Sequence, residues 1–469
     1  MVLDRDDRGG RRTRGPDRGR GIARAARTLA LTAVLTLAAA FAAAAFAAAG
    51  TALASGGAPL GGPPPTKHHH ARHHSKGHHS HRHHRSKPSA HHAAGPNPLK
   101  GRAMWIWELG STDHGDLSAI IAGARLYGVN TVFIKSSDGR DFWSNQFTRT
   151  IVHALHAGGL KVCAWQYVYG SSPLKEANLG AEAVRDGANC LVIDAEAQYE
   201  GRYIAAQTYI ERLRSLIGPS YPVALAGFPY VDFHPSFPYS VFLGPGGAQY
   251  NVPQMYWKDI GTSVAAVYAH TYSFNRIYQR PIFPLGQLYS NPPPGQIVRF
   301  RELDLAYGAG GISWWDWQSA SAKAWNAMSL PIDTLPDVTP DKAMAVVGRG
   351  ASGDLVVWAQ EHLVSAGFPV KISGEFKYRT YNAVLAFQAK HGLTTDGELG
   401  PDTWAALLRY KPVHVDWSLD RRLAAGAQLR TAAASLGAGG SPTVTLPVPL
   451  SASDPARRNE IPGSLGAGR

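Results

Sequence analysis

Eight short apolar runs alternate with amphipathic stretches between residues 103 and 328, and this alternation limits the possible folds more than any other feature of the sequence. The stretches between the runs have the spacing of amphipathic helices and close on glycine, as LSAIIAGARLYG does. Strands that alternate with helices predict an α/β fold, with a (β/α)8 TIM barrel at residues 100–330. The predicted strands are residues 103–109, 131–137, 161–168, 190–196, 222–228, 252–257, 281–289 and 310–317.

The first 54 residues have the composition of an export signal peptide. A charged segment up to Arg27 is followed by an alanine-rich apolar segment and then by the small residues around Ala54. We expect cleavage after Ala54 and a secreted protein of the cell wall. About 20 apolar residues are also enough to span a bilayer, so contact with the membrane is expected only if the segment is retained as an anchor.

Polar segments of low complexity lie on either side of the folded part. Residues 55–99 include a tract with twelve histidines and have no apolar period, which predicts a disordered His-rich linker. Loose binding of Zn²⁺ or Ni²⁺ is a second interpretation of this tract. Residues 331–345 predict a linker rich in Pro and Asp, and residues 411–469 predict a disordered Ala/Gly/Pro tail.

The positive charge of the chain is concentrated at its N-terminus. Residues 1–100 hold 16 Lys and Arg against 4 Asp and Glu, whereas the remainder holds 31 against 30. The folded part is therefore nearly neutral, which argues against a nucleic-acid partner. No Gly-rich phosphate motif follows the first strand, and we predict no cofactor and no metal site. Cys163 and Cys190 fall on neighbouring predicted strands, which is compatible with a disulfide or with two buried thiols.

A second compact unit is predicted at residues 346–410, with three helices that begin near Asp354, near Thr380 and at Pro401. Its motifs are GASGD at 350–354, GEF at 374–376, FQ at 387–388, GLTTDG at 392–397 and GPDTW at 400–404. In these motifs the unit resembles the peptidoglycan-binding-like domain of bacterial cell-wall hydrolases. The resemblance implies a small three-helix domain, with peptidoglycan or a related N-acetylated glycan as the partner.

Two carboxylates close the fourth predicted strand, within the sequence CLVIDAEAQY of residues 190–199. In a parallel barrel the active site forms at the carboxyl ends of the strands. Side chains alternate along a strand, so Asp194 and Glu196 should both point into the mouth of the barrel, where each charge raises the pKa of the other. Glycosidic cleavage needs a carboxylic acid that stays protonated near neutral pH. We therefore predict Glu196 and Asp194 as the catalytic residues.

Aromatic side chains gather at the ends of the other predicted strands, and sugar rings pack their C–H faces on such surfaces. Packing inside the barrel would equally account for any one of these residues. Carboxylates and amides beside them can form hydrogen bonds with hydroxyls and acetamides. The predicted substrate-binding residues are Trp107, Glu108, Trp165, Tyr167, Gln254, Tyr256, Trp315, Asp316 and Trp317.

The triplets at residues 194–196 and 254–256 give the barrel a second resemblance. With Asp-Ala-Glu on strand four and Gln-Met-Tyr on strand six, it resembles the family 25 lysozymes and the family 18 chitinase-like glycoside hydrolases. The resemblance implies that Glu196 is the general acid, that Asp194 assists at the acetamide of the substrate, and that Tyr256 helps to hold this group. Val192 stands where the chitinase-like pattern has a further Asp, and Trp107 with Glu108 stands where the lysozyme pattern has an Asp.

These features predict a secreted, metal-independent glycosidase of the muramidase-like or glucosaminidase-like kind, which the unit at residues 346–410 holds at the cell wall. The departures at Val192 and Trp107 leave a second class open. In that alternative the chain is a non-catalytic wall-binding protein whose two domains both recognise glycan.

Overall fold

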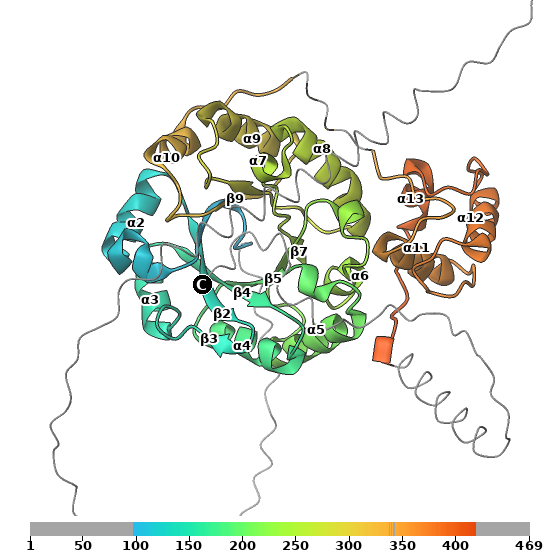
Figure 1. The fold of residues 1–469 in the computed structure, drawn as a ribbon, viewed down its shortest axis with the longest axis horizontal. Helices are drawn as coiled ribbons and strands as arrows, with labels where there is room; N and C mark the ends of the chain where they lie inside the picture. Colours follow the sequence, from blue (N-terminus) through green and yellow to red (C-terminus); the bar gives the residue numbers. More distant parts are fainter. Residues whose placement is uncertain (1–96, 337, 339, 341–342, 419–469) are drawn as a thin grey trace, which may run out of the picture. The chain divides into compact units, whose positions relative to one another are not determined.

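The computed structural model describes residues 97–336, 338, 340 and 343–418 of the chain (Figure 1). The predicted signal peptide, the His-rich linker up to residue 96 and the predicted tail from residue 419 lie outside the described residues. Among the described residues, no helix is both long and apolar enough to cross a membrane.

One sheet with eight parallel strands forms the centre of the larger unit, and helices surround it (Figure 1). The strands follow one another in the order β7-β6-β5-β4-β2-β1-β9-β8. Parallel bridges from Asn251 to Ile282 and from Gln254 to Leu285 join the two ends of this order, so the sheet closes into the predicted (β/α) barrel. The parallel strands are β1 Gly101–Ile106, β2 Thr131–Asp138, β4 Lys161–Val168, β5 Cys190–Ala195, β6 Val223–Ala226, β7 Tyr250–Asn251, β8 Leu285–Gln287 and β9 Gly311–Trp315.

Four of the nine α-helices of the barrel, α2, α3, α8 and α10, begin with a polar side chain that accepts a hydrogen bond from a free backbone N–H group. Asp116 accepts hydrogen bonds from the N–H groups of Ser118 and Ala119, and Ser263 and Ser321 cap two later helices. The α-helices are α2 Leu117–Leu126, α3 Arg149–Ala157, α4 Pro173–Arg185, α5 Tyr203–Ile217, α6 Tyr239–Phe242, α7 Trp257–Ile260, α8 Val264–Asn275, α9 Pro294–Ala306 and α10 Ala322–Ser329.

Alternate side chains of each strand belong to different layers. Met104, Ile106, Val132 and Ile134 belong to the apolar core that packs the sheet against the helices. Residues of the other parity lie inside the barrel, where Trp105 contacts the rings of Phe133, Trp165 and Trp315. The parity of Asp194 and Glu196 places both on the inner side.

The structure differs most from the predicted strands in three places. The run predicted at residues 281–289 is a strand only at β8, Leu285–Gln287. No strand forms within the range predicted at residues 252–257, because Pro253 lacks an N–H group for the ladder and only the bridge at Gln254 remains; β7 is the pair Tyr250–Asn251 just before this range. A short antiparallel strand that was not predicted, β3 at Asp141–Phe142, pairs with the end of β2. It directs the chain from β2 into the loop before α3.

Cys163 and Cys190 form a disulfide. They face each other in register on β4 and β5, with a distance of 4.6 Å between their Cα atoms. Of the two alternatives that the sequence leaves open, the structure has the disulfide.

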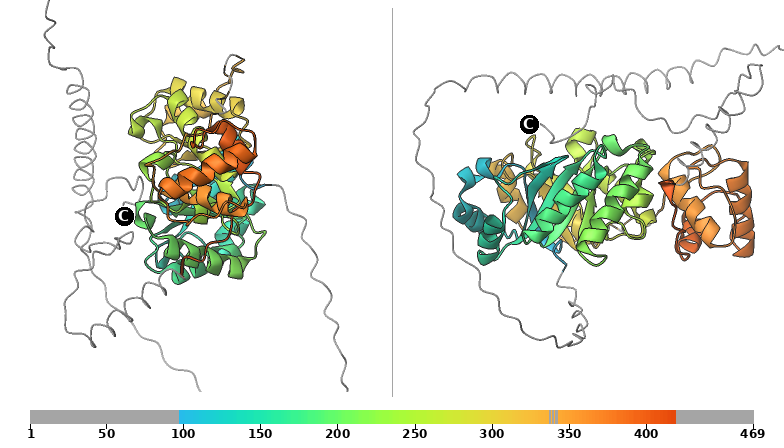
Figure 2. Two further views of the ribbon diagram at one scale, coloured as in Figure 1. Left: turned by 90° about the vertical axis from the view of Figure 1, so that its right-hand side faces the viewer. Right: turned by 90° about the horizontal axis from the view of Figure 1, so that it is seen from below.

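The C-terminal unit contains three helices, α11 Asp354–Ser365, α12 Tyr378–Lys390 and α13 Pro401–Leu407, as predicted (Figure 2). Its core includes Leu363, Val384, Phe387, Trp404 and Leu407, all of which are fully buried. Two glutamines, Gln360 and Gln388, fasten the loops between the helices.

Polar contacts connect this unit and the following residues to the barrel. The Asp354 carboxylate accepts hydrogen bonds from the backbone N–H of Ser240 at 2.8 Å and from the hydroxyls of Ser240 and Tyr278, each at 2.7 Å. The side-chain amide of Gln207 donates to the carbonyl oxygen of Val415 at 3.1 Å. The prediction of a disordered tail from residue 411 therefore does not hold for residues 411–418.

Candidate active site at the mouth of the barrel

The carboxyl groups of Asp194 and Glu196 lie together at the end of β5, inside the mouth of the barrel. The side-chain amide of Gln254 donates one hydrogen bond to Asp194 Oδ1 at 3.1 Å and another to Glu196 Oε1 at 3.0 Å. An amide nitrogen carries two hydrogens, so Gln254 can serve both carboxyl groups at once. The expectation that Asp194 and Glu196 face the same way is confirmed.

Burial raises the pKa of both carboxyl groups. Glu196 is 3% exposed and Asp194 is 7% exposed, so their charged forms have lost most of their hydration. Burial raises the pKa of Glu196 to about 7, although hydrogen bonds from Gln254 and Tyr167 oppose the shift. The pKa of Asp194 is raised well above its usual value, first by burial and then by the neighbouring Glu196, whereas the positive charge of Lys135 lowers it. A proton is therefore available on this pair at neutral pH.

The Tyr167 hydroxyl can donate its hydrogen to Glu196 or to Gln198. The Tyr167 hydroxyl lies 2.8 Å from Gln198 Oε1 and 3.2 Å from Glu196 Oε2. One phenolic hydrogen serves only one of these acceptors well, and the shorter distance favours Gln198. The bond to Glu196 Oε2 is the weaker of the two, and it opposes the rise in the pKa of Glu196 only in part.

Lys135 is buried beside the pair, with 1% of its surface exposed. Its Nζ forms an ion pair with Asp138 at 2.7 Å and lies 4.9 Å from the centre of the Trp165 ring. The ion pair compensates its charge inside the barrel. The sequence interpretation missed this residue, although a lysine at an inner position of the otherwise uncharged run TVFIKSS was a visible signal.

Four of the other predicted residues, Trp165, Trp315, Tyr256 and Asp316, are buried in the barrel. Trp165 and Trp315 lie inside the barrel, with 5.4 Å between their ring centres, and form the floor beneath the carboxyl pair. Tyr256 is buried near the pair, and burial together with the charges of Tyr289, Asp194 and Glu196 raises its pKa. Asp316 is 1% exposed, and burial raises its pKa to about 6.

Trp107 and Glu108 are half-buried at the end of β1, to one side of the carboxyl pair. The indole nitrogen of Trp107 is buried and has no hydrogen-bond partner among the described residues. The backbone of this turn is held by Gln318, whose side-chain oxygen accepts a hydrogen bond from the Trp107 N–H at 3.2 Å.

Trp317 is the predicted residue that the structure does not bring to the mouth. Its ring packs against Trp325 of α10, with 4.9 Å between ring centres, and close to Gly123 of α2. The position of the Trp317 ring does not support the prediction that this residue contacts substrate. The predicted strand ended at Trp317, whereas β9 ends at Trp315 and the chain turns towards the helices after it.

Comparison with known proteins identifies the C-terminal unit most clearly. Residues 352–407 match the family model described as "Putative peptidoglycan binding domain". A peptidoglycan-binding protein from Clostridioides difficile shares 46% identity over 13% of this chain and 40% of its own, with a TM-score of 0.13. This chain thus spans two fifths of the length of that protein. The SleB N-terminal domain shares 41% identity over 14% of this chain and 90% of its own, with a TM-score of 0.14.

A longer and weaker match covers the barrel. The spore cortex-lytic enzyme SleL from Bacillus cereus is similar over 50% of this chain and 75% of its own, with 13% identity and a TM-score of 0.38. No curated protein matches the sequence. The assignment of the barrel fold therefore depends on its own strand order and closure.

Proposed function

We propose that this chain is a secreted cell-wall glycoside hydrolase that cleaves N-acetylated glycan, with peptidoglycan as its substrate. The observation that carries the proposal is the buried pair of Asp194 and Glu196, which Gln254 bridges and in which burial raises the pKa of Glu196 to about 7. Such a group is protonated at the pH where it must donate a proton to a leaving group.

In the proposed mechanism Glu196 donates its proton to the glycosidic oxygen as the bond to the anomeric carbon breaks. The carbonyl oxygen of the substrate's own acetamide attacks that carbon from the opposite side. Asp194 stabilises the positive charge that develops on the acetamide, and the hydroxyl of Tyr256 holds the group in place. The Glu196 carboxylate then takes a proton from the water that opens the cyclic intermediate, and the anomeric configuration is retained.

The spacing of the two carboxyl groups supports retention. Asp194 Oδ1 and Glu196 Oε1 both bind one nitrogen atom, at 3.1 and 3.0 Å, so they are at most about 6 Å apart. Inverting glycosidases keep their carboxyl groups roughly 6.5–9.5 Å apart to admit a water molecule. The shorter spacing fits an attack by the substrate itself.

The family match at residues 352–407 supports peptidoglycan as the partner and the cell wall as the location. The proposal requires no cofactor, no metal ion and no nucleic acid. Contact with a membrane would arise only if the predicted signal segment stayed on the chain as an anchor.

The first test is the Glu196→Gln substitution, which keeps the size of the side chain and removes its proton. Purified peptidoglycan is incubated with the full chain, reduced with borohydride and analysed by mass spectrometry, while NMR follows the anomeric configuration of the new ends. We expect new reduced sugar ends with the wild type and a rate at least about 10²-fold lower with Glu196→Gln. Equal rates for the two proteins would contradict the assigned role, and inverted products would contradict the acetamide-assisted step.

A second function is favoured by the low exposure of the carboxyl pair. With only 3% of Glu196 exposed, a substrate reaches its proton only if neighbouring side chains move. A chain in which they do not move would bind wall glycan with both domains and cut none of it. In the same experiment, intact glycan together with protein that sediments with the wall would identify this binding-only function.

A further inference from the structure

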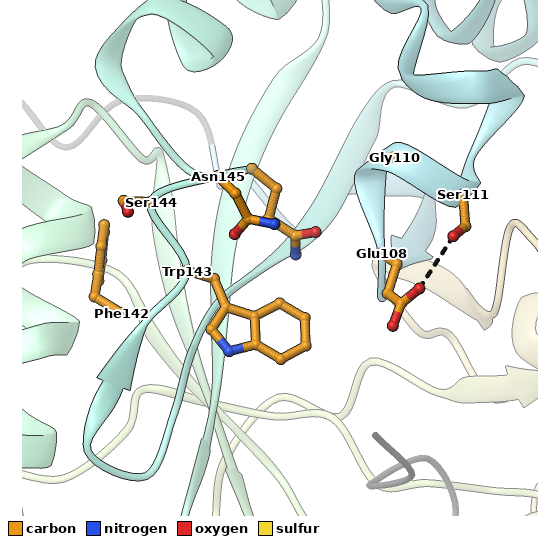
Figure 3. A pocket seen from close by; sticks show the side chains of 8 residues that line it. Glu108, Gly110, Ser111, Phe142, Trp143, Ser144 and Asn145 are labelled. Carbon is orange, nitrogen blue, oxygen red and sulfur yellow. Dashed lines mark hydrogen bonds between the residues drawn. The ribbon is translucent and has the colours of Figure 1, made fainter. Parts of the chain in front are cut away.

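A pocket of about 450 Å³ opens between the turn after β1 and the loop after β3 (Figure 3). This volume is in the range of sites that bind small ligands. Its lining residues are Glu108, Gly110, Ser111, Phe142, Trp143, Ser144, Asn145 and Gln146.

Gln146 holds the two walls of the pocket together. Its side-chain nitrogen donates to the carbonyl oxygens of Trp107 at 2.8 Å and Lys135 at 2.9 Å, and its oxygen accepts from the N–H of Leu109 at 2.9 Å. The amide is buried and all three bonds join it to the backbone of β2 or of the chain after β1. These bonds hold the backbone on the two sides of the pocket in place without a ligand.

Glu108 gives the pocket an uncompensated negative charge. One of its carboxylate oxygens accepts a hydrogen bond from the Ser111 hydroxyl at 3.0 Å (Figure 3). Among the described residues the other oxygen has no hydrogen-bond partner, and no Lys, Arg or His forms an ion pair with Glu108. The remaining lining residues are uncharged, so the pocket favours a ligand that brings a positive group.

Trp143 supplies an aromatic wall opposite Glu108 (Figure 3). Lys135 Nζ lies 4.5 Å from the centre of the Trp143 ring and 4.9 Å from that of Trp165. The charge of Lys135 is compensated by Asp138, so it does not repel a cation in the pocket. Through Lys135 the pocket adjoins the floor of the mouth, so one glycan strand can reach both.

We infer that this pocket binds an amino sugar whose nitrogen is a free ammonium group, as in a partly deacetylated glycan strand. The sugar ring packs on Trp143 and the ammonium group donates to the free oxygen of Glu108. Since an acetamide is neutral, it forms a weaker bond with the carboxylate. The inference rests on the proposed function and adds a preference for strands that carry a deacetylated residue next to the one that is cut.

The test measures binding apart from cleavage. The full chain with Glu196→Gln is titrated in a calorimeter with a glucosamine hexamer and with an N-acetylglucosamine hexamer, at pH 6 and 150 mM salt, which screens nonspecific attraction. We expect the glucosamine hexamer to bind about tenfold more tightly. Adding Glu108→Gln should remove this preference, and Trp143→Ala should weaken the binding of both hexamers.

A matched control is Glu182→Gln on α4, outside the pocket, which should keep the preference. Glu108→Lys is a second variant, and it should bind the glucosamine hexamer more weakly than Glu108→Gln does. Equal affinity of the starting protein for the two hexamers, or a preference that survives Glu108→Gln, would overturn the inference. Because cleavage is not measured here, such a result is distinct from failure of the proposed hydrolysis.

Discussion

At the scale of single residues, the proton on Glu196 sets the pH at which the proposed reaction can run. Burial raises its pKa to about 7, and a general acid works only while it is protonated. The value of kcat/KM should therefore fall as the pH rises through about 7.

A substitution at Gln254 should change the pH at which kcat/KM falls. The hydrogen bond from Gln254 lowers the pKa of Glu196. The variant Gln254→Met has a similar side-chain volume and no donor, so it should raise this pKa. The fall of kcat/KM should then occur at a higher pH. The measurement is kcat/KM on soluble peptidoglycan fragments between pH 4 and pH 9. A lower kcat/KM that still falls at the same pH would show that Gln254 does not set the pKa of Glu196.

At the scale of elements, the sequence predicted the strands well where they were long and apolar. The runs predicted at residues 161–168 and 190–196 are mostly apolar, and β4 and β5 follow them closely. The alternation of side chains also predicted correctly that Asp194 and Glu196 point inward. The predicted strand bounds are wrong where a strand is short, as at β7, because two residues are too few to show an alternation of apolar and polar side chains.

Positions on a strand explain the residues that were misjudged. Trp317 lies two residues after the end of β9, and its ring packs against Trp325 of α10. Lys135 and Trp143 were missed because their importance depends on contacts between β2, β3 and β4. Such contacts between elements follow from the register of the sheet, which the sequence alone does not supply.

The disulfide between β4 and β5 gives a prediction at the same scale. It closes a loop with a sequence separation of 27 residues, which corresponds to a stabilisation of about 3–4 kcal/mol if the unfolded chain is the state that it constrains. We expect the double substitution Cys163→Ala and Cys190→Ala to lower the free energy of unfolding in urea by roughly this amount. The variant should also be insensitive to a reducing agent, whereas the wild type should lose stability when reduced. Equal stability of the variant and the oxidised wild type would contradict the prediction.

At the scale of the whole molecule, burial raises the pKa of seven carboxyl groups among the described residues. Burial is the first cause in every case. The groups are those of Glu176, Asp194, Glu196, Asp304, Asp316, Asp354 and Glu361. Their combined effect on stability should exceed that of any one side chain.

A carboxyl group with a higher pKa in the folded chain than in the unfolded chain binds its proton more tightly when folded. Its contribution to stability is complete below the unfolded pKa and is lost as the pH rises through the folded pKa. The raised pKa values, about 6 for Asp316 and Asp354 and about 7 for Glu196, place this loss between about pH 4 and pH 7. The buried His362, whose pKa is lowered to about 4, acts in the opposite direction.

We therefore expect the free energy of unfolding to fall by several kcal/mol as the pH rises from about 4.5 to about 7, on the order of 1.4 kcal/mol for each unit of raised pKa. Thermal unfolding at a series of pH values measures this. Glu196→Gln should make the fall shallower, because the amide has no charge to bury. Stability that rises across this range would show that the buried carboxyl groups are better compensated than their surroundings indicate.

The bond between Cys163 and Cys190 has a practical consequence for following the protein on its target. The chain has 2 cysteines and both are joined, so the folded protein offers no thiol to an alkylating dye. An Asn145→Cys substitution at the exposed edge of the pocket would then provide the single reactive sulfur of the molecule. A fluorophore attached there would report, one molecule at a time, when a glycan strand enters the pocket and when it leaves.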